Sequence, residues 1–355
     1  MGRTRNAVEE QSSRRFESSR LRQELYFIME YQDRIYGNFN ISDPVILELI
    51  NGRSLQRLKE ISQIGYPKPY FFDAGFSRFE HSLGVYLLLR KYNALIEEQI
   101  AGLIHDVSHS AFSHCIDYAL EAGSEAEHDH QDNVFEEFVK KSEIPEILNK
   151  FGFNIDHILS DENFPLKEKK LPDLCADRID YSLRSALTFK VLSPEEISEL
   201  LDNLTVSDGN WVFKNLEFAE KYAKVFMKLN NDYYAGLASA AMLKNVGAYL
   251  RQALNKGYIV EVDLYSTDEK VLAKIAPFHQ KDAELKKLFD RMDGKIKFSN
   301  NPDSYDVQSI CKSRVVDPLF KTENDVKRFS QINAEWAKKL KEELSPKCYF
   351  IKFSE

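Results

Sequence analysis

The chain has 355 residues, of which 43% are hydrophobic and 12% aromatic, so it can bury a large core and is not a disordered chain throughout. Its formal net charge of −8 gives no general attraction to nucleic acid or to an anionic membrane surface, and a small-molecule partner is expected instead. The four cysteines lie far apart without a CxxC pair, which argues against a disulfide framework or a thiolate zinc site and predicts reduced thiols in the cytoplasm.

Residues 1–22 predict a charged flexible tail. They contain six arginines and three glutamates but almost no large apolar side chains, a composition that suits a mobile segment, a frayed helix or a contact arm. No apolar run approaches the roughly 20 residues that a membrane span needs, and the N-terminal stretch has no hydrophobic signal region. We therefore expect a cytoplasmic protein that is not attached to a membrane.

Turn and capping residues organise the next fifty positions. Aromatic and β-branched residues around Gly37-Asn38 predict a hairpin. A helix is expected to open on Pro44, to break near Gly52 and to continue as a second helix to Gly65. The two prolines in 66–77 predict a loop before the long helices begin.

Long helical segments dominate the middle of the chain, and a mixed texture follows residue 257. The expected helices are 77–92, 95–106, 111–122, 130–142, 172–188, 194–204, 216–229 and 231–256, with a short turn or hairpin at 205–215. Beyond them we expect strands in 257–264, 294–299, 313–320 and 347–353, and helices at 267–275, 282–292 and 323–344. The predicted fold is mainly α, with a helical domain over 23–256 and a smaller α+β region over 257–355.

Histidines gather in one part of this helical body. Six of the eight lie between residues 81 and 130. The segment 79–90 is apolar on every side at helical spacing, so His81 is expected to be buried. A buried imidazole needs a hydrogen-bond partner or a metal ion, because an unsatisfied polar group costs roughly 1–3 kcal/mol. For His81 alone, a core histidine bonded to a carbonyl is the simpler alternative.

The pair His105-Asp106 ends an apolar helix and places a carboxylate where a cation or an arginine is needed. A further carboxylate, Asp177, lies on a polar helix side that would equally suit a solvated face. Together His81, His105, Asp106 and Asp177 offer two neutral nitrogens and two carboxylates, which match one divalent ion. Mixed nitrogen and oxygen ligands leave Mn²⁺, Fe²⁺, Ni²⁺, Mg²⁺ and Zn²⁺ open.

With these residues assembled, the sequence resembles the HD-domain metal-dependent phosphohydrolases, whose signature is a His, a His-Asp pair and a distal Asp. The blocks "RFEHSLGV", "LIHDVSHSAFSH" and "ADRIDYSLR" look like the branch of deoxynucleoside triphosphate triphosphohydrolases and related bacterial HD-superfamily phosphohydrolases. With "DRIYGNFNISDPVILELI" and "LQRLKEISQIG", the similarity runs from about residue 32 to 190. It implies an HD helical core, one metal ion held by these four residues, hydrolysis of (deoxy)nucleoside triphosphates to nucleoside and triphosphate by metal-activated water, and a homo-oligomer.

The resemblance also implies catalytic roles. His109 corresponds to a histidine on the water and phosphate side of the site, and His114 to one that activates or positions the attacking water. Asp117 supports His114, and His130 is the acid, with His128 as the competing choice.

Substrate contacts are implied in the same way. Arg78 and Arg178 correspond to phosphate contacts, Gln63 to a sugar contact and Tyr181 to an aromatic side chain against the sugar. A salt bridge for Arg78, exposure for Gln63 and packing for Tyr181 would explain these residues equally simply.

The sequence departs from the family pattern in three places, one of which is Ser185, where relatives often carry an aspartate after the DYxxR motif. Ser108 and Ser110 replace glycines in a tight turn, and Ala111 replaces a proline there. Segment 232–254 gives no convincing counterpart of the family's later helix, whose arginine, tyrosine and histidine groups grip the nucleotide in relatives. Two alternatives therefore stay open, a phosphatase or nucleotidase acting on another phosphoester and a non-catalytic nucleotide-sensing scaffold.

Overall fold

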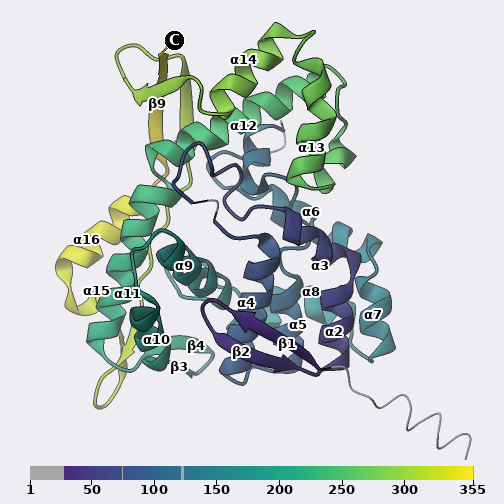
Figure 1. The fold of residues 1–355 in the computed structure, drawn as a ribbon. Helices are drawn as coiled ribbons and strands as arrows, with labels where there is room; N and C mark the ends of the chain where they lie inside the picture. The colour runs from purple at the N-terminus through teal and green to yellow at the C-terminus, as the bar shows by residue number, and fades with distance from the viewer. Residues whose placement is uncertain (1–27, 74, 121–123, 355) are drawn as a thin grey trace, which may run out of the picture.

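The computed structural model describes residues 28–73, 75–120 and 124–354 (Figure 1). The tail expected at 1–22 lies outside this range. The described chain opens with an antiparallel hairpin of β1 (Met29–Asp33) and β2 (Gly37–Ile41). Its turn is residues 34–36, one step before the predicted Gly37-Asn38, because the Asp33 carboxylate accepts hydrogen bonds from the backbone amides of Ile35 and Tyr36.

Helices form the body that follows, in agreement with the mainly α fold class. They are α2 (Pro44–Asn51), α3 (Arg53–Arg57), α4 (Arg78–Lys91), α5 (Ile96–Ile104), α6 (His130–Lys141), α7 (Ile144–Lys150), α8 (Ile155–Leu159) and α9 (Ala176–Thr188). The expected loop 66–77 contains no helix or strand. The helix predicted at 111–122 is instead a short 3₁₀ helix, Ser113–Tyr118.

The second half adds helices and short strands. They are α10 (Pro194–Asp202), β3 (Leu204–Ser207), β4 (Asn210–Phe213), α11 (Leu216–Leu229), a π-helical turn (Asn230–Tyr234), α12 (Leu237–Asn255), α13 (Asp268–Ile275), α14 (Ala283–Met292), β5 (Lys297–Asn300), β6 (Val307–Cys311), β7 (Leu319–Lys321), β8 (Val326–Arg328), α15 (Phe329–Ile332), α16 (Ala334–Glu343) and β9 (Lys347–Ser354).

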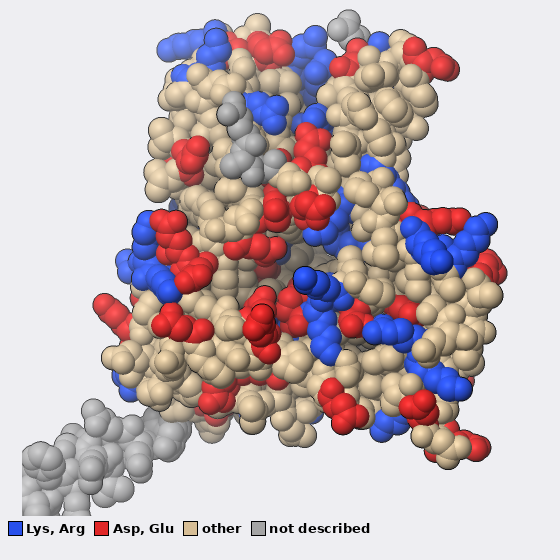
Figure 2. Space-filling view, turned by 180° about the vertical axis from the view of Figure 1, so that it is seen from behind, with Lys and Arg blue, Asp and Glu red and all other residues tan. Residues whose placement is uncertain are grey.

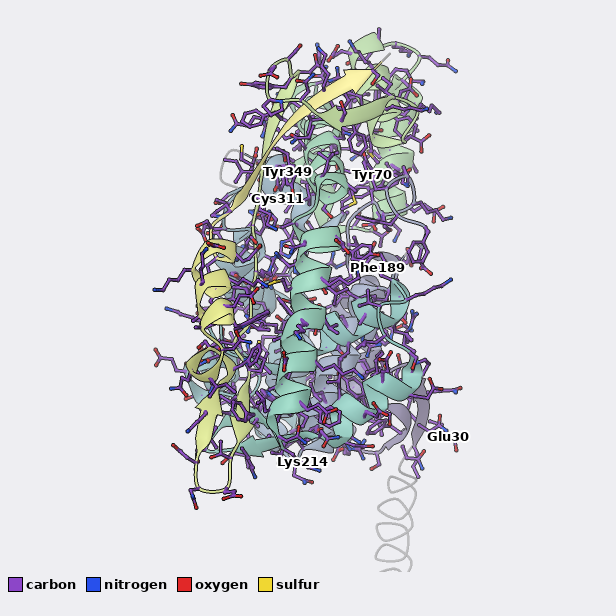
Figure 3. All side chains as sticks on the ribbon, turned by 90° about the vertical axis from the view of Figure 1, so that its left-hand side faces the viewer. Glu30, Tyr70, Phe189, Lys214, Cys311 and Tyr349 are labelled. Carbon is purple, nitrogen blue, oxygen red and sulfur yellow. The ribbon has the colours of Figure 1, made fainter. Side chains whose placement is uncertain are left out.

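The C-terminal region packs along the helical body. Strand β7 pairs in parallel with β4 in the order β3-β4-β7-β8, so residues on both sides of position 256 share one sheet. A second sheet, β5-β9-β6, lies against α12. Figure 3 shows this segment running beside the long helices, with Cys311 and Tyr349 close together at its upper part. A residue of the C-terminal region can therefore reach a site built by the helical body.

Helix α4 occupies the centre of the helical body. A capping box of Ser77 and Glu80 begins it. Every residue from Phe79 to Leu89 except Glu80 is buried, as the apolar pattern predicted, and α5 and α9 pack against it. This arrangement places His81 in the interior between two other helices.

Two predictions in the C-terminal region are wrong, and a third, the strand at 313–320, is correct only at Leu319 and Phe320, where β7 begins. Residues 257–264 are not a strand: Asp263 accepts a hydrogen bond from the amide of Val260, and a 3₁₀ helix forms over Glu261–Tyr265 with Val262 73% exposed. The single helix predicted at 323–344 is β8 followed by α15 and α16, because Asn333 caps a new helix by accepting from the amide of Trp336. A local side-chain cap overrides the apolar pattern in both cases.

In the part of the chain that the structure describes, the face of the molecule opposite to that seen in Figure 1 has no large patch of only basic or only acidic side chains. Figure 2 shows basic and acidic side chains intermixed there around a hollow near the middle. Among the described residues, no helix is both long and apolar enough to cross a membrane.

Candidate metal centre and adjoining cavity

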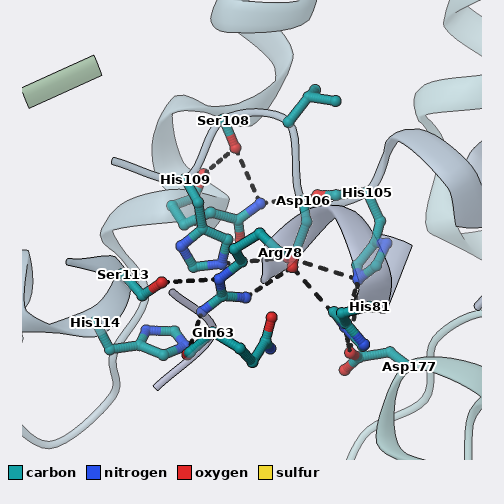
Figure 4. A network of polar contacts seen from close by, with 12 residues as sticks. Gln63, Arg78, His81, His105, Asp106, Ser108, His109, Ser113, His114 and Asp177 are labelled. Atoms are coloured by element: carbon teal, nitrogen blue, oxygen red, sulfur yellow. Dashed lines mark hydrogen bonds and ion pairs between the residues drawn. The ribbon is translucent and has the colours of Figure 1, made fainter. Parts of the chain in front are cut away.

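Three segments bring the four predicted ligands together (Figure 4). His81 lies in the first turn of α4, His105 and Asp106 follow the end of α5, and Asp177 lies in the first turn of α9. The ligand atoms of His81, His105 and Asp106 all lie within 4.8 Å of one another. Asp177 Oδ1 is 2.8 Å from His81 Nε2 and 3.5 Å from His105 Nε2.

Hydrogen bonds behind the two imidazoles fix which nitrogens face inward. His81 Nδ1 lies 2.7 Å from Asp180 Oδ2, and His105 Nδ1 lies 2.7 Å from the carbonyl oxygen of Gly102. Because these partners only accept, each Nδ1 carries a hydrogen, and Nε2 is the atom of each ring that can offer a lone pair to an ion. The two Nε2 atoms are 3.2 Å apart. Two lone pairs and two carboxylates at this spacing repel one another without a shared cation, so the donor set fits a divalent ion.

The pKa values of His81 and Asp106 are both shifted by the charged groups around them. Burial lowers the pKa of His81, but its hydrogen bonds to Asp177 and Asp180 outweigh burial and raise it to about 9. Without an ion, a proton on Nε2 therefore lies between His81 and Asp177, and binding of a divalent ion would displace it. Burial raises the pKa of Asp106, yet Arg78, His105 and His109 together hold it well below the usual value. The carboxylate is therefore ionised and ready to bind a cation.

A buried ionic chain extends from His81 to the entry hairpin. Asp180 accepts from Arg184 Nε at 2.8 Å, and Arg184 Nη2 donates to Asp33 Oδ2 at 2.8 Å. The side chains of Asp180, Arg184 and Asp33 are all 0% exposed. The polar helix side that suited a solvated face is therefore buried at Arg184. This chain orients the His81 ring, as carboxylates behind metal-binding histidines do.

Gly84 leaves room for this chain beside α4. A Cβ at position 84 would lie 2.0 Å from Arg184 Nη2 and 2.1 Å from Asp180 Oδ1. We expect Gly84→Ala to lower the free energy of unfolding by about 1–3 kcal/mol or more, because the charged pair must shift within a packed core. Urea denaturation would measure this change. Ser82→Ala in the same helix is the control, since the Ser82 hydroxyl is buried without a partner and its removal should be close to neutral; equal losses would contradict the explanation.

Arg78 joins the metal-ligand group to an adjoining cavity. It is 2% exposed; its Nη1 donates to Asp106 Oδ2 at 2.7 Å and its Nε donates to Ser113 Oγ at 2.9 Å. Figure 4 shows Arg78 between the ligand group on one side and Gln63 and His114 on the other. The salt bridge to Asp106 agrees with the simpler of the two alternatives given for Arg78. Arg78 also lines the cavity, so it is in a position to contact a phosphate there.

The cavity contains about 680 Å³ of empty space, including its open mouth. Its walls combine two arginines, two histidines and a largely neutral, partly aromatic surface. The lining residues are Gln63, Ile64, Arg78, His114, His128, Tyr181, Ser185, Tyr233, Tyr234, Ser239, Met242, Leu243 and Arg314. Its composition, a mostly neutral wall with a few charged and hydrogen-bonding groups, is typical of small-molecule sites.

The predicted catalytic histidines divide between the cavity and its surroundings. His114 lines the cavity, with its Nδ1 3.4 Å from Asp117 Oδ2. His109 is buried behind it, with Nε2 3.2 Å from Asp106 Oδ1. His128, not His130, lines the cavity and stacks on His114 with ring centres 5.2 Å apart. His130 Nε2 instead lies 3.2 Å from the Tyr265 hydroxyl.

The predicted substrate contacts also separate. Gln63 and Tyr181 line the cavity, and the Gln63 amide oxygen is buried without a partner. Arg178 is not among the lining residues. Its Nη1 donates to the carbonyl oxygens of Lys169 and Asp173 at 3.2 and 2.6 Å, so it fixes the segment that leads into α9.

Sequence reasoning missed the cavity's second cation and part of its aromatic wall. Arg314 comes from the C-terminal region, where its amide donates to Asn230 Oδ1 at 2.8 Å. Tyr233 and Tyr234 come from the π-helical turn. A charged residue inside "CKSRVVDP" and a tyrosine pair before Gly236 were visible signals, but only the fold brings them to one place.

The turn with the serine substitutions keeps a tight geometry. Ser108 and Ser110 do not adopt positive φ; the left-handed residues are Phe112 (φ 60°) and Ser113 (φ 49°). The Gln131 amide donates to Ser108 Oγ at 2.9 Å, which ties the turn to α6. Serines are accommodated here because these two positions do not need glycine.

Comparisons with known proteins agree with the site. The HD domain family model matches residues 78–184. The uncharacterized protein YdhJ of Bacillus subtilis is 36% identical, over 82% of this chain and 88% of that protein. The metal-dependent phosphohydrolase cns2 of Cordyceps militaris is 30% identical, over 69% of this chain and 70% of that protein.

More distant matches extend the picture. The deoxynucleoside triphosphate triphosphohydrolase SAMHD1 of Mus musculus is 32% identical, but over only 34% of this chain and 21% of that protein. A phosphohydrolase structure from Bacteroides thetaiotaomicron has a TM-score of 0.69 at 17% identity, covering 93% of this chain and 100% of that one, and shares the fold. From the motif order, the converging ligands and these matches together, the chain belongs to the HD-domain family of metal-dependent phosphohydrolases.

Proposed function

We propose that the protein hydrolyses a phosphoester of a nucleotide in the cavity beside the metal centre. The observation that carries this proposal is the place of Arg78, which contacts the ligand Asp106 and lines the cavity at the same time. A phosphoryl group held by Arg78 would lie next to the four metal ligands. A guanidinium suits this task because it donates several hydrogen bonds in a plane.

His81, His105, Asp106 and Asp177 would hold the divalent ion. When bound, such an ion lowers the pKa of a coordinated water and neutralises phosphate charge. We propose that His114 accepts the proton of the attacking water, with Asp117 orienting its ring. Burial lowers the pKa of His114 well below the usual value, which keeps the imidazole neutral and able to accept.

A second histidine would protonate the leaving oxygen. His128 suits this role better than His130 in the described geometry, because it lines the cavity and stacks on His114. Burial lowers the pKa of His128 as well. The negative charge of a bound phosphoester would raise that pKa and favour the protonated form at the time of reaction.

The neutral wall suits the nucleoside. Tyr181, Tyr233 and Tyr234 line the cavity with Ser185 and Ser239. Tyrosine faces can contact a base or sugar, and the buried amide of Gln63 offers a hydrogen-bonding group to a ligand. Tyr181 also packs within the wall, since its ring centre lies 5.6 Å from that of Tyr234.

Two bonds are candidates for cleavage. Release of triphosphate from a (deoxy)nucleoside triphosphate is supported by the SAMHD1 similarity over the motif region. Release of orthophosphate, as by a phosphatase or nucleotidase, is favoured by the mostly uncharged residues that segment 232–254 gives the cavity. Mn²⁺ as the ion, a homo-oligomeric state and a cytoplasmic location are further parts of the proposal.

The test is a substrate screen on the full chain with added Mn²⁺, detecting both orthophosphate and triphosphate. The proposal expects metal-dependent hydrolysis of at least one nucleotide and loss of that activity in Asp106→Ala. Nucleotide binding without turnover across several metals would support the non-catalytic scaffold instead. Full activity in metal-free protein would contradict the proposed chemistry.

Replacing the histidines one at a time separates their roles. We expect His114→Gln and His128→Gln each to lower kcat by about 10²–10⁴-fold, because each removes a proton-transfer group. His130→Gln is the matched comparison and should change kcat much less, since His130 does not line the cavity. Steady-state kinetics of the three variants would show this, and a larger loss in His130→Gln than in His128→Gln would reverse the assignment.

A further inference from the structure

The charges of the cavity bear on which phosphoester it accepts. Among the described lining residues, the charged ones are Arg78 and Arg314, and none of the others is a lysine, aspartate or glutamate. Arg78 is paired at 2.7 Å with Asp106, with both side chains no more than 6% exposed. Arg314 contacts a carbonyl oxygen, that of Lys312, at 3.5 Å. The site therefore offers few positive charges to a substrate.

Other arginines near the cavity do not add positive charge to its wall, because their guanidinium groups bind backbone carbonyl oxygens. Arg57 Nη2 donates to the carbonyls of Val107 and His109 at 2.7 and 2.8 Å. Arg251 Nη2 donates to the carbonyl of Tyr118 at 2.7 Å, and Arg178 is held by Lys169 and Asp173. These three guanidinium groups stabilise loops around the cavity and are not among its lining residues.

The net positive charge that the cavity can offer to a substrate is small. Asp106 and Asp177 together match the charge of one divalent ion, which leaves the two positive charges of Arg78 and Arg314. The buried Asp33–Arg184–Asp180 chain behind His81 carries one net negative charge, but none of its three residues lines the cavity, so the charges that face a substrate there are those of Arg78 and Arg314. The lining histidines His114 and His128 add no charge in the free protein, because burial lowers the pKa of both.

A phosphate monoester carries about −1.5 to −2 at pH 7, and each additional phosphoryl group adds about one negative charge. We propose that the substrate is a nucleoside monophosphate whose dianion matches Arg78 and Arg314, and that the product is orthophosphate. This inference rests on the proposed function and selects one of its two candidate bonds. A triphosphate would leave negative charge uncompensated between the neutral walls formed by Tyr181, Tyr233, Tyr234, Met242 and Leu243.

The reaction balances with water alone. The water oxygen forms the new bond to phosphorus, and the P–O bond to the nucleoside oxygen breaks with its electron pair on that oxygen. His114 accepts a proton from the water. His128 takes up a proton from solvent when the phosphoester binds and delivers it to the leaving oxygen, and His114 later returns its proton to solvent. The products are a nucleoside hydroxyl and orthophosphate.

The decisive experiment compares AMP, dAMP, ADP, ATP and dATP on the full chain with Mn²⁺, and with excess Mg²⁺ so that the polyphosphates carry a counter-ion. Orthophosphate, pyrophosphate and triphosphate are measured separately. We expect kcat/KM for a monophosphate to exceed that for ATP and dATP by about 100-fold or more, the scale set by an uncompensated buried charge. Triphosphate release from dATP with an equal or higher kcat/KM would overturn the inference but leave the proposed phosphohydrolase intact. No product from any substrate would contradict both.

Equilibrium binding gives a readout that does not depend on turnover. Calorimetry with inorganic phosphate and inorganic triphosphate should show that the triphosphate gains no affinity from its additional charges. Arg314→Gln should weaken phosphate binding by about 10-fold or more, since the cavity loses one of its two cations. Arg328→Gln is the control, because Arg328 pairs with Asp173 at 2.5 Å and does not line the cavity. Equal weakening in both variants, or tighter binding of triphosphate, would contradict the charge match.

Discussion

Asp177→Asn is expected to lower phosphate release by about 10³-fold or more and to remove the bound metal ion. An amide replaces one of two charged ligands, and metal ions supply several kcal/mol of transition-state stabilisation in such sites. Asp177 is the most suitable ligand to change, because its side chain is 23% exposed whereas that of His81 is 0% exposed. Asparagine keeps the shape of the side chain, so the fold should remain. Elemental analysis of the purified variant and a phosphate-release assay would measure the two effects.

Asp173→Asn is the matched control for this variant. Asp173 lies four residues earlier and pairs with Arg328 on the surface, where its side chain is 31% exposed. It should keep the wild-type metal content and activity. An Asp177→Asn protein that retains one ion per chain and full activity would show that Asp177 is not a ligand.

Arg184→Met is expected to lower the free energy of unfolding by about 3–5 kcal/mol, the largest stability effect among these variants. It leaves the buried carboxylates of Asp180 and Asp33 without their shared cation. Removing one partner of a buried ion pair costs more than the pair itself contributes. Urea denaturation followed by circular dichroism would measure the loss. Exposed Lys141→Met, which breaks only a surface pair with Glu137, should stay within about 0.5 kcal/mol.

The same chain should influence the metal centre. Asp180→Asn keeps a hydrogen-bond acceptor for His81 Nδ1 but removes the charge, and we expect metal affinity to fall by about 10–100-fold. A triple variant with Asn at positions 33 and 180 and Met at 184 should recover part of the stability lost by Arg184→Met, because no uncompensated charge remains. If the triple variant is no more stable than Arg184→Met, charge is not the cause of the loss.

The grouping of His81, His105 and Asp106 was predictable from sequence because these three residues follow local rules. His81 interrupts a helix that is apolar on every side, and His105-Asp106 ends another apolar helix. The order of these motifs carried the resemblance to the HD family. Periodicity alone could not tell whether the helix side of Asp177 is a solvated face or part of a site. The structure excludes a fully solvated face, because Asp180 and Arg184 on the same helix are buried in the ionic chain.

The cavity was less predictable because its walls come from distant segments. Arg314 reaches it from a segment more than 200 residues beyond His81 in the chain, and no periodic pattern marks that segment. The choice between His128 and His130 was not predictable either, because no sequence pattern marks the turn into α6, where His128 has a positive φ of 53° and lines the cavity. Arg178 has a strong positional match to a phosphate contact, but in the fold its guanidinium binds the carbonyl oxygens of Lys169 and Asp173.

The central claim is that His81, His105, Asp106 and Asp177 hold one divalent ion. Anomalous diffraction from crystals of the full chain grown with Mn²⁺ tests it most directly, because the signal locates the ion without depending on a substrate. We predict a single strong peak bounded by the Nε2 atoms of the two histidines and by oxygens of the two aspartates. A peak at the neighbouring group of Glu168, Cys175 and Asp177 alone, or no peak at the four ligands, would contradict the account.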